Sequence, residues 1–195
     1  MPHVTLHPPY HIRKLWPLDL NAFRRHLLRL DHETRLARFG TAVNDSFLHA
    51  YADTARRTGT LIYGAFVGHE MHGSAELRAL HEAGDEVAEA AFAVEAEHQH
   101  HGLGSALMDR IIQAAQNRNI GQVHMICMRE NHNMKRLAEK FGAQFRVVDG
   151  EATGEIVPEH ATEHSLLDEA VHDETEFITA VLDWQAELPG YRKSA

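Results

Sequence analysis

Residues 86–117 read EVAEAAFAVEAEHQHHGLGSALMDRIIQAAQN, and this stretch decides the fold. Residues 86–95 are rich in alanine and glutamate, which favour a helix by intrinsic propensity. A glycine loop follows them, and then Leu107, Ile111 and Ala115 recur at the spacing of one helix face. Because an amphipathic helix follows the loop, we interpret residues 86–95 as a strand and residues 104–117 as that helix.

The loop between these two elements, residues 99–104, has the composition of an anion-binding turn. Its backbone N–H groups and the first turn of the following helix form a nest for negative charge. Gly102 and Gly104 leave room for a diphosphate close to the backbone. The loop lacks the lysine of a Walker P-loop and the GxGxxG pattern. From these glycines alone, a plain turn that uses glycine for a positive φ is the simpler interpretation.

Two segments together resemble the GNAT superfamily of N-acetyltransferases. Gln99-x-x-Gly102-x-Gly104 matches the Q/R-x-x-G-x-G/A signature of that family, and ENHNMKRLAEKFG at 130–142 is similar to its N-x-x-M-x-x-L-x-x-K-x-G-F segment. Ala143 stands in place of the final aromatic residue. Two segments at the family's separation are much more specific than one. The resemblance covers about residues 86–145.

A narrower resemblance lies near the N-terminus. The stretch LRLDHETRLARF, residues 28–39, is similar to the L-S-x-E-S-R-x-x-R-F stretch of bacterial protein lysine acetyltransferases. This resemblance favours a protein substrate. Those proteins often carry an additional acyl-CoA-synthetase-like domain for which this chain has no room, so a small-molecule substrate stays open.

The family implies an α/β fold, the GNAT fold: a mixed, mostly antiparallel twisted sheet that is splayed at the acetyl-CoA site and flanked by helices. We expect an acetyltransferase domain over residues 1–160 and a C-terminal helical extension over 161–195, packed on the same domain or on a partner subunit. Asp19 is expected to cap the first helix, and residues 122–128 are expected to form a buried strand. The expected strands are 11–15, 60–67, 71–78, 86–95, 122–128, 143–149 and 153–157, and the expected helices are 20–30, 32–39, 44–55, 104–117, 131–141 and 164–187.

The resemblance implies acetyl-CoA as the acyl donor. Its pantetheine would pair like an extra strand with residues 92–94, its diphosphate would lie on N–H groups of residues 101–105, and Asn131 would lie near the pantetheine or the sulfur. Lys135 and Arg136 occupy positions where a 3′-phosphate is met, although such a pair is more often solvated. The expected cofactor-binding residues are Phe92, Ala93, Val94, Gln99, His100, His101, Gly102, Leu103, Gly104, Ser105 and Asn131.

Acetyl transfer to an amine requires a base, because an ammonium group with a pKa of ~10.4 is almost entirely protonated at pH 7. In the lysine acetyltransferases that the chain resembles, the proposed base lies in the strand before the loop, and the matching residue here is Glu89. A solvated strand residue is an equally good interpretation of Glu89, and Glu76 is the second candidate. The resemblance also implies that the backbone N–H of Val94 stabilises the oxyanion.

The family's usual general acid, a tyrosine, is replaced by Ala138. Cys127, Tyr63 or a water could take its place. Two functions therefore stay open: an N-acetyltransferase that acts directly on a protein lysine or a small-molecule amine, and a non-catalytic acyl-CoA-binding sensor or partner-binding module. The missing tyrosine favours the second function and Glu89 favours the first.

Composition limits the partners. A formal net charge of −9 repels phosphate backbones and attracts an amine, so we expect no nucleic acid partner. No run reaches the ~20 apolar residues of a membrane span, the first residues have no signal-peptide pattern, and there is a single cysteine. We therefore expect a cytoplasmic protein. The apolar face of the last helix must cover the sheet or a second subunit, which suggests a homodimer.

The 17 histidines form no set that is completed by a cysteine or by an HExxH pattern, so we expect no metal site. His100 and His101 flank the phosphate loop, and basic residues are common at these positions in the family. If one of them contacts the diphosphate when protonated, CoA affinity falls as pH rises through ~6 to 8. A solvated histidine is at least as good an interpretation of either residue.

Overall fold

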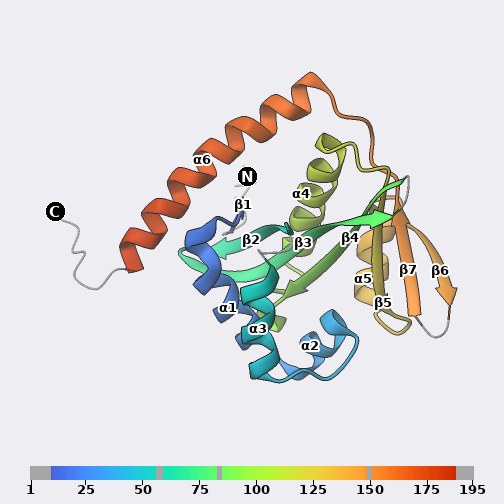
Figure 1. Cartoon of the computed structure of the whole chain (residues 1–195). Helices are drawn as coiled ribbons and strands as arrows, with labels where there is room; N and C mark the ends of the chain where they lie inside the picture. Colours follow the sequence, from blue (N-terminus) through green and yellow to red (C-terminus); the bar gives the residue numbers. More distant parts are fainter. Residues whose placement is uncertain (1–9, 56–58, 83–84, 149–150, 188–195) are drawn as a thin grey trace, which may run out of the picture.

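The computed structural model describes residues 10–55, 59–82, 85–148 and 151–187, and one seven-stranded sheet forms its centre (Figure 1). The strands are ordered β1-β2-β3-β4-β5-β7-β6, and only β4 and β5 are parallel neighbours. The strands are β1 (His11–Lys14), β2 (Leu61–Val67), β3 (Glu70–Glu82), β4 (Asp85–Val94), β5 (Gln122–Met128), β6 (Gln144–Val148) and β7 (Glu151–Ile156). The helices are α1 (Leu20–Arg29), α2 (His32–Phe39), α3 (Asp45–Ala55), α4 (Leu103–Asn117), α5 (His132–Lys140) and α6 (Glu163–Glu187), with short 3₁₀ turns η1 (Pro17–Asp19) and η2 (Ala96–His98). The predicted mixed, mostly antiparallel sheet is confirmed.

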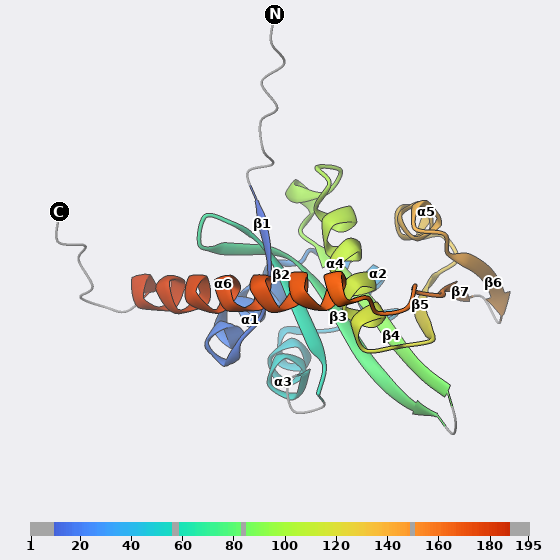
Figure 2. The same ribbon diagram turned by 90° about the horizontal axis from the view of Figure 1, so that it is seen from above.

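Helices cover both faces of the sheet (Figure 2), and each face has its own core. On one face, α4 buries Leu107 and Ile111 against the small side chains Ala75 of β3 and Ala88 of β4. On the other face, α1 packs against α3 and β3, and the buried side chains of this core include Phe23, Leu27, Leu48, Ile62 and Phe66. Alanine along β4 allows close packing on both faces. This explains why a stretch with helical propensity is nevertheless a strand.

The parallel pair β4 and β5 separates after a short contact. Residues 87–89 pair with residues 122–124, and no further pair of these two strands is in register. From Ala90 to Val94, β4 is bonded only to β3 within the described sheet. The predicted splay is therefore present at the middle of the sheet.

Two local predictions hold only in part. Asp19 occupies the N-cap position of α1 as predicted, but its side chain makes no capping hydrogen bond. Its carboxylate accepts instead from the Arg13 guanidinium, at 2.7 and 2.8 Å, and from the backbone N–H of Trp16. Strand β5 is not buried throughout, because it alternates between two environments. Met125 packs in the core under α4, while Ile126 is 54% exposed and faces the opening between the strands.

The last helix, α6, lies across β1, η1 and α4 on the outside of the domain (Figures 1 and 2). Within the described ranges, no helix is both long enough and apolar enough to cross a bilayer.

Candidate active site

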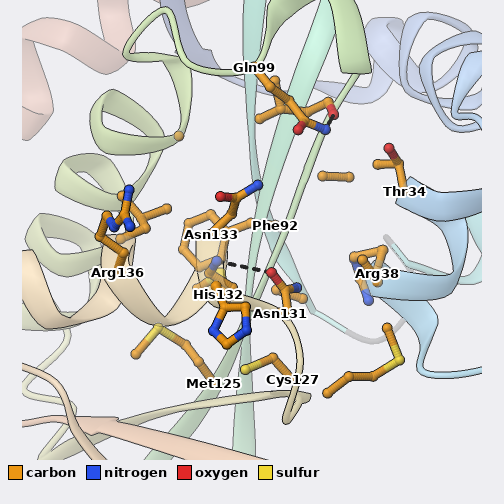
Figure 3. A pocket seen from close by; sticks show the side chains of 18 of the residues that line it. Thr34, Arg38, Phe92, Gln99, Met125, Cys127, Asn131, His132, Asn133 and Arg136 are labelled. Atoms are coloured by element: carbon orange, nitrogen blue, oxygen red, sulfur yellow. Dashed lines mark hydrogen bonds between the residues drawn. The ribbon is translucent and has the colours of Figure 1, made fainter.

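A cavity of about 820 Å³ opens where β4 and β5 separate, and we call it the splay cavity. Its walls come from α2 on one side and from the loop after β4, the start of α4 and α5 on the other side (Figure 3). Thr34 and Arg38 of α2 face it from one wall and Arg136 of α5 from the opposite wall, with Cys127 of β5 between them (Figure 3). The cavity is thus lined from both sides of the opening between β4 and β5.

The loop at the mouth of the splay cavity has the backbone of an anion-binding turn. Gly102 precedes α4 with φ +90°, a conformation that side chains other than glycine rarely adopt. The first intrahelical bond runs from Ala106 to Gly102, so the N–H groups of Leu103, Gly104 and Ser105 have no acceptor within the helix. These donors and the helix dipole favour a negatively charged group.

Two contacts fix this loop in place. The side-chain amide of Gln99 donates to the carbonyl oxygen of Val94 at 3.0 Å, so the loop is tied to the end of β4. A Cβ atom on Gly104 would lie 3.3 Å from Leu137, so this glycine allows α4 and α5 to approach each other closely. The motif residues therefore have structural roles that also shape the anion site.

Most of the predicted cofactor-binding residues lie together. Leu103 does not face the splay cavity, because it is buried in the core under α4, and His101 is not part of the lining. Asn131 faces the cavity, and its side-chain oxygen accepts from the Met134 N–H at 3.0 Å and caps α5. The predicted residues that line the cavity are Phe92, Ala93, Val94, Gln99, His100, Gly102, Gly104, Ser105 and Asn131.

Basic side chains from α5 line the same wall. Arg136 lines the splay cavity and Lys135 does not. Lys140 was not anticipated from the sequence: its ammonium group donates to the Ser105 hydroxyl at 3.3 Å, which brings it to the first turn of α4. Its position one helical turn after Arg136 was the signal in the sequence. Two cations thus lie beside the anion-binding loop.

A smaller pocket of about 190 Å³, which we call the side pocket, adjoins the splay cavity. The two share Arg38 of α2 and Ala91 of β4. The side pocket is lined by Arg38, Tyr51, Thr54, Ala55, Thr60, Glu76, Arg78, Glu89 and Ala91. Both glutamates that were candidates for the base, Glu76 and Glu89, therefore line this pocket and not the splay cavity.

Glu76 is buried and held by two donors. Arg38 donates to one carboxylate oxygen and Tyr51 to the other, both at 2.7 Å, and Arg38 also donates to the Tyr51 hydroxyl at 2.6 Å. Burial, with the nearby Glu76 charge, raises the pKa of Tyr51 above its usual range. Burial opposes the charge of Arg38, but the Glu76 carboxylate raises its pKa, so the arginine stays charged. These three residues lie far apart in the sequence, so no short motif predicts that they form a network.

Glu89 is more accessible than Glu76. Its carboxylate accepts from Arg78 on the neighbouring strand at 2.6 Å, and the pair is partly exposed. An exposed ion pair of this kind contributes little to stability and can open. Glu89 therefore has fewer fixed partners than Glu76 and is the more available carboxylate.

Glu95, at the end of β4, contacts three basic side chains. Its carboxylate contacts His26, Arg29 and His72 at 2.9 Å each. Burial alone would raise the pKa of Glu95, but the hydrogen bonds from these three residues lower it to about 2. His26 in turn is fully buried, contacts Ser74 at 3.2 Å and has a pKa lowered by burial. Glu95 is thus a structural anion and not a base.

Of the groups considered as a general acid, only Cys127 reaches the splay cavity. Burial raises the pKa of its thiol, so the thiol is protonated at neutral pH. Tyr63 lies in the core under α4 and lines neither pocket, and Ala138 is buried. Among the described residues, no group of three or more His, Cys, Asp or Glu side chains is arranged to hold a metal ion.

The comparisons with known proteins place the chain in a family. The family model described as "Acetyltransferase (GNAT) family" matches residues 24–143. No curated protein sequence matches the chain.

Solved structures share the fold at low identity. The GNAT domain of PAT from S. lividans matches with a TM-score of 0.65 and 20% identity over 76% of this chain and 90% of that chain. The putative acetyltransferase yncA from Salmonella typhimurium, solved with acetyl-CoA, matches with a TM-score of 0.61 and 18% identity over 79% and 97% of the two chains. Spermidine N-acetyltransferase from Vibrio cholerae, solved with CoA and spermine, matches with a TM-score of 0.60 and 17% identity over 77% and 96%.

The chain therefore belongs to the GNAT acetyltransferase family. It is an acetyltransferase, and acetyl-CoA is its acyl donor. The splay, the glycine loop and α5 are the parts of the structure that carry the family's two sequence segments.

Proposed function

We propose that the chain transfers the acetyl group directly to a primary amine that enters through the side pocket. The observation that carries this proposal is the junction of the two pockets at Arg38 and Ala91. The splay cavity offers an anion-binding loop for the donor, and the side pocket offers carboxylates for a cation. An acceptor in the side pocket would thus meet the donor at β4.

The donor would be held by the residues of the splay cavity. The N–H groups at the start of α4 bind the diphosphate, and Arg136 and Lys140 add positive charge beside it. The edge of β4 from Ala90 to Val94, which is not paired with β5, binds the pantetheine in the manner of a strand. When bound, acetyl-CoA supplies a thioester whose thiolate leaves readily, with a pKa near ~8.5 by analogy with cysteine.

Glu89 would act as the general base. Its partly exposed carboxylate moves from Arg78 to the incoming ammonium and accepts its proton, directly or through one water. The Val94 N–H, at the end of β4, donates to the oxyanion. Glu76 stays fixed by Arg38 and Tyr51 and is not available as a base. No covalent acetyl-enzyme is required.

The test is an assay of CoA release with a panel of amines that contains lysine peptides, polyamines and amino acids. The proposal predicts amine-dependent release of CoA and an acetylated product by mass spectrometry. Binding of acetyl-CoA without turnover of any amine would overturn the proposal and favour an acyl-CoA-binding sensor. Glu97→Gln is the matched control for variants of Glu89, because Glu97 is exposed and lines neither pocket.

A further inference from the structure

The helix α6 packs on the domain in the reverse of the usual amphipathic orientation. The side chains of Glu169, Asp173, Glu176 and Asp183 face the domain, at spacings of four, three and seven residues. A helix usually buries its apolar stripe and exposes its charges. In α6, by contrast, the buried stripe is acidic.

Four cations of the domain neutralise this acidic stripe. Arg118 pairs with Glu169 at 2.9 Å, Lys14 with Asp173 at 2.6 Å, Arg110 with Glu176 at 2.5 Å and Arg13 with Asp183 at 3.1 Å. Glu176 also accepts from the backbone N–H of Lys14, so the helix covers the free edge of β1. These contacts fix which face of α6 points outward.

The outward face of α6 is apolar. Leu167, Val171, Ile178 and Leu182 recur at spacings of four, seven and four residues, lie opposite the acidic stripe and are between 55% and 65% exposed. Leu166, Phe177 and Trp184 flank this face, and the Phe177 ring packs edge-on against Trp16 of the domain. Each of the four side chains in the stripe leaves more than half of its surface exposed, and together they form one continuous apolar stripe on a single helix. A contiguous exposed apolar stripe of this kind marks an interaction surface.

The pattern of this face is complementary to itself. About the midpoint between residues 174 and 175, an antiparallel copy of α6 places Leu167 opposite Leu182 and Val171 opposite Ile178. A two-fold axis requires one patch to match itself in this way. Glu174 then lies opposite Thr175 of the second copy and not opposite another glutamate.

The charges of the helix argue against a lipid surface. Residues 163–187 contain no lysine or arginine. Helices that lie on membranes carry basic residues on the polar face, and an acidic helix is repelled by anionic lipids.

We propose that this chain forms a homodimer by antiparallel pairing of α6 with α6 of a second copy through the outward apolar face. The interface is independent of the acetyl-transfer site, since none of its residues lines either pocket. The first test is sedimentation velocity of the whole chain over about 1–100 µM, a range in which a Kd near 1 µM is visible.

The double variant Val171→Gln/Ile178→Gln should raise the dimer Kd at least tenfold. Glutamine keeps the helix propensity, and both positions are exposed, so the variant should fold. Val157→Ser is the matched control, because Val157 is exposed outside α6 and should leave the Kd unchanged. A wild-type monomer at all concentrations, or a dimer that the double variant does not weaken, overturns the proposal.

Cysteine cross-linking tests the orientation. Thr175→Cys should form a disulfide with residue 175 of the second copy, because both lie next to the midpoint of the pair. Leu167→Cys should not cross-link to itself but should cross-link to Leu182→Cys when the two variants are mixed. At ~1.5 Å of rise per residue, two copies of residue 167 lie far beyond the ~7 Å limit for a disulfide. The native Cys127 is buried, so the unmodified chain is the blank.

Self-cross-linking of Leu167→Cys would indicate a parallel pair, and vesicle binding abolished by the double variant would indicate a membrane surface; either result overturns the proposal.

Discussion

The two walls of the splay cavity are built in different ways. The wall of the loop and α4 uses consecutive residues and backbone N–H groups, and it rests on an apolar core. The wall of α2 and the side pocket uses the Arg38–Glu76 ion pair and the hydrogen bonds that both residues make with Tyr51, and the three residues come from separate elements. The first wall can be recognised from a short motif, whereas the second exists only after the chain has folded. The difference suggests that donor binding and acceptor chemistry can be changed separately.

The largest effect should come from Gly102→Glu on the donor wall. The variant places a carboxylate in the anion site and forces a side chain into φ +90°. We expect acetyl-CoA binding to weaken by at least ~100-fold, or ~2.8 kcal/mol, in calorimetric titration. Gly102→Ala introduces the backbone strain without the charge, and its acetyl-CoA affinity should fall about tenfold. Equal losses in the two variants would contradict the role of the N–H groups as an anion site.

On the acceptor wall, Glu89→Gln should lower kcat by about 10²–10⁴-fold, the range typical of a general base. Its acetyl-CoA affinity should stay within about twofold, because Glu89 does not line the splay cavity. Steady-state kinetics with the best amine of the panel measures the first quantity and calorimetry the second. If kcat is unchanged while Glu97→Gln behaves like the wild type, Glu89 is not the base.

A smaller effect is expected for Arg38→Lys. A lysine keeps the charge but cannot donate to Tyr51 and Glu76 with the geometry of a guanidinium. One lost charged hydrogen bond of about 1.5–3 kcal/mol predicts at least a tenfold drop in kcat/KM for the amine. Arg24→Lys, at an exposed pair with Asp53, is the matched control and should show no change. A drop caused only by weaker acetyl-CoA binding would place Arg38 on the donor wall instead.

The smallest effect concerns the pH dependence of stability, and it arises from His26 and Glu95 at the end of β4. His26 has a lowered pKa in the folded chain, so the unfolded chain binds more protons and stability falls as pH drops below ~6.5. The pKa of Glu95 is lowered to about 2, so its contribution is present above ~4.5 and is lost as pH falls from there towards 2. We expect the thermal midpoint to fall by a few degrees between pH 7.5 and 5.5, and less in His26→Gln. An equal fall in the variant would assign the pH dependence to other groups.

The sequence was sufficient for the donor wall and for the order of the elements. Its glycines, its amphipathic helix and the cap Asn131 depend on neighbours within a few residues. The position of Asp19 at the start of α1 was predicted correctly, but the partner of its side chain was not, because Arg13 belongs to a different element.

The ion pairs of the acceptor wall and the orientation of α6 could not be predicted from local patterns, for the same reason. Glu76 is neutralised by Arg38, 38 residues away, and Glu176 by Arg110, 66 residues away. Periodicity shows that a helix has an apolar stripe, but which stripe faces the domain depends on cations elsewhere in the chain. Ion pairs between distant residues thus determine the acceptor wall and the orientation of α6, which periodicity does not predict.

Acetyl-CoA should bind in the splay between β4 and β5. Hydrogen–deuterium exchange of the whole chain, with and without saturating acetyl-CoA, measures this. Binding there should slow exchange in residues 90–105 and at the start of α5, with α3 and α6 unchanged. Protection confined to other elements, or no protection of residues 90–105 under saturating conditions, would contradict it.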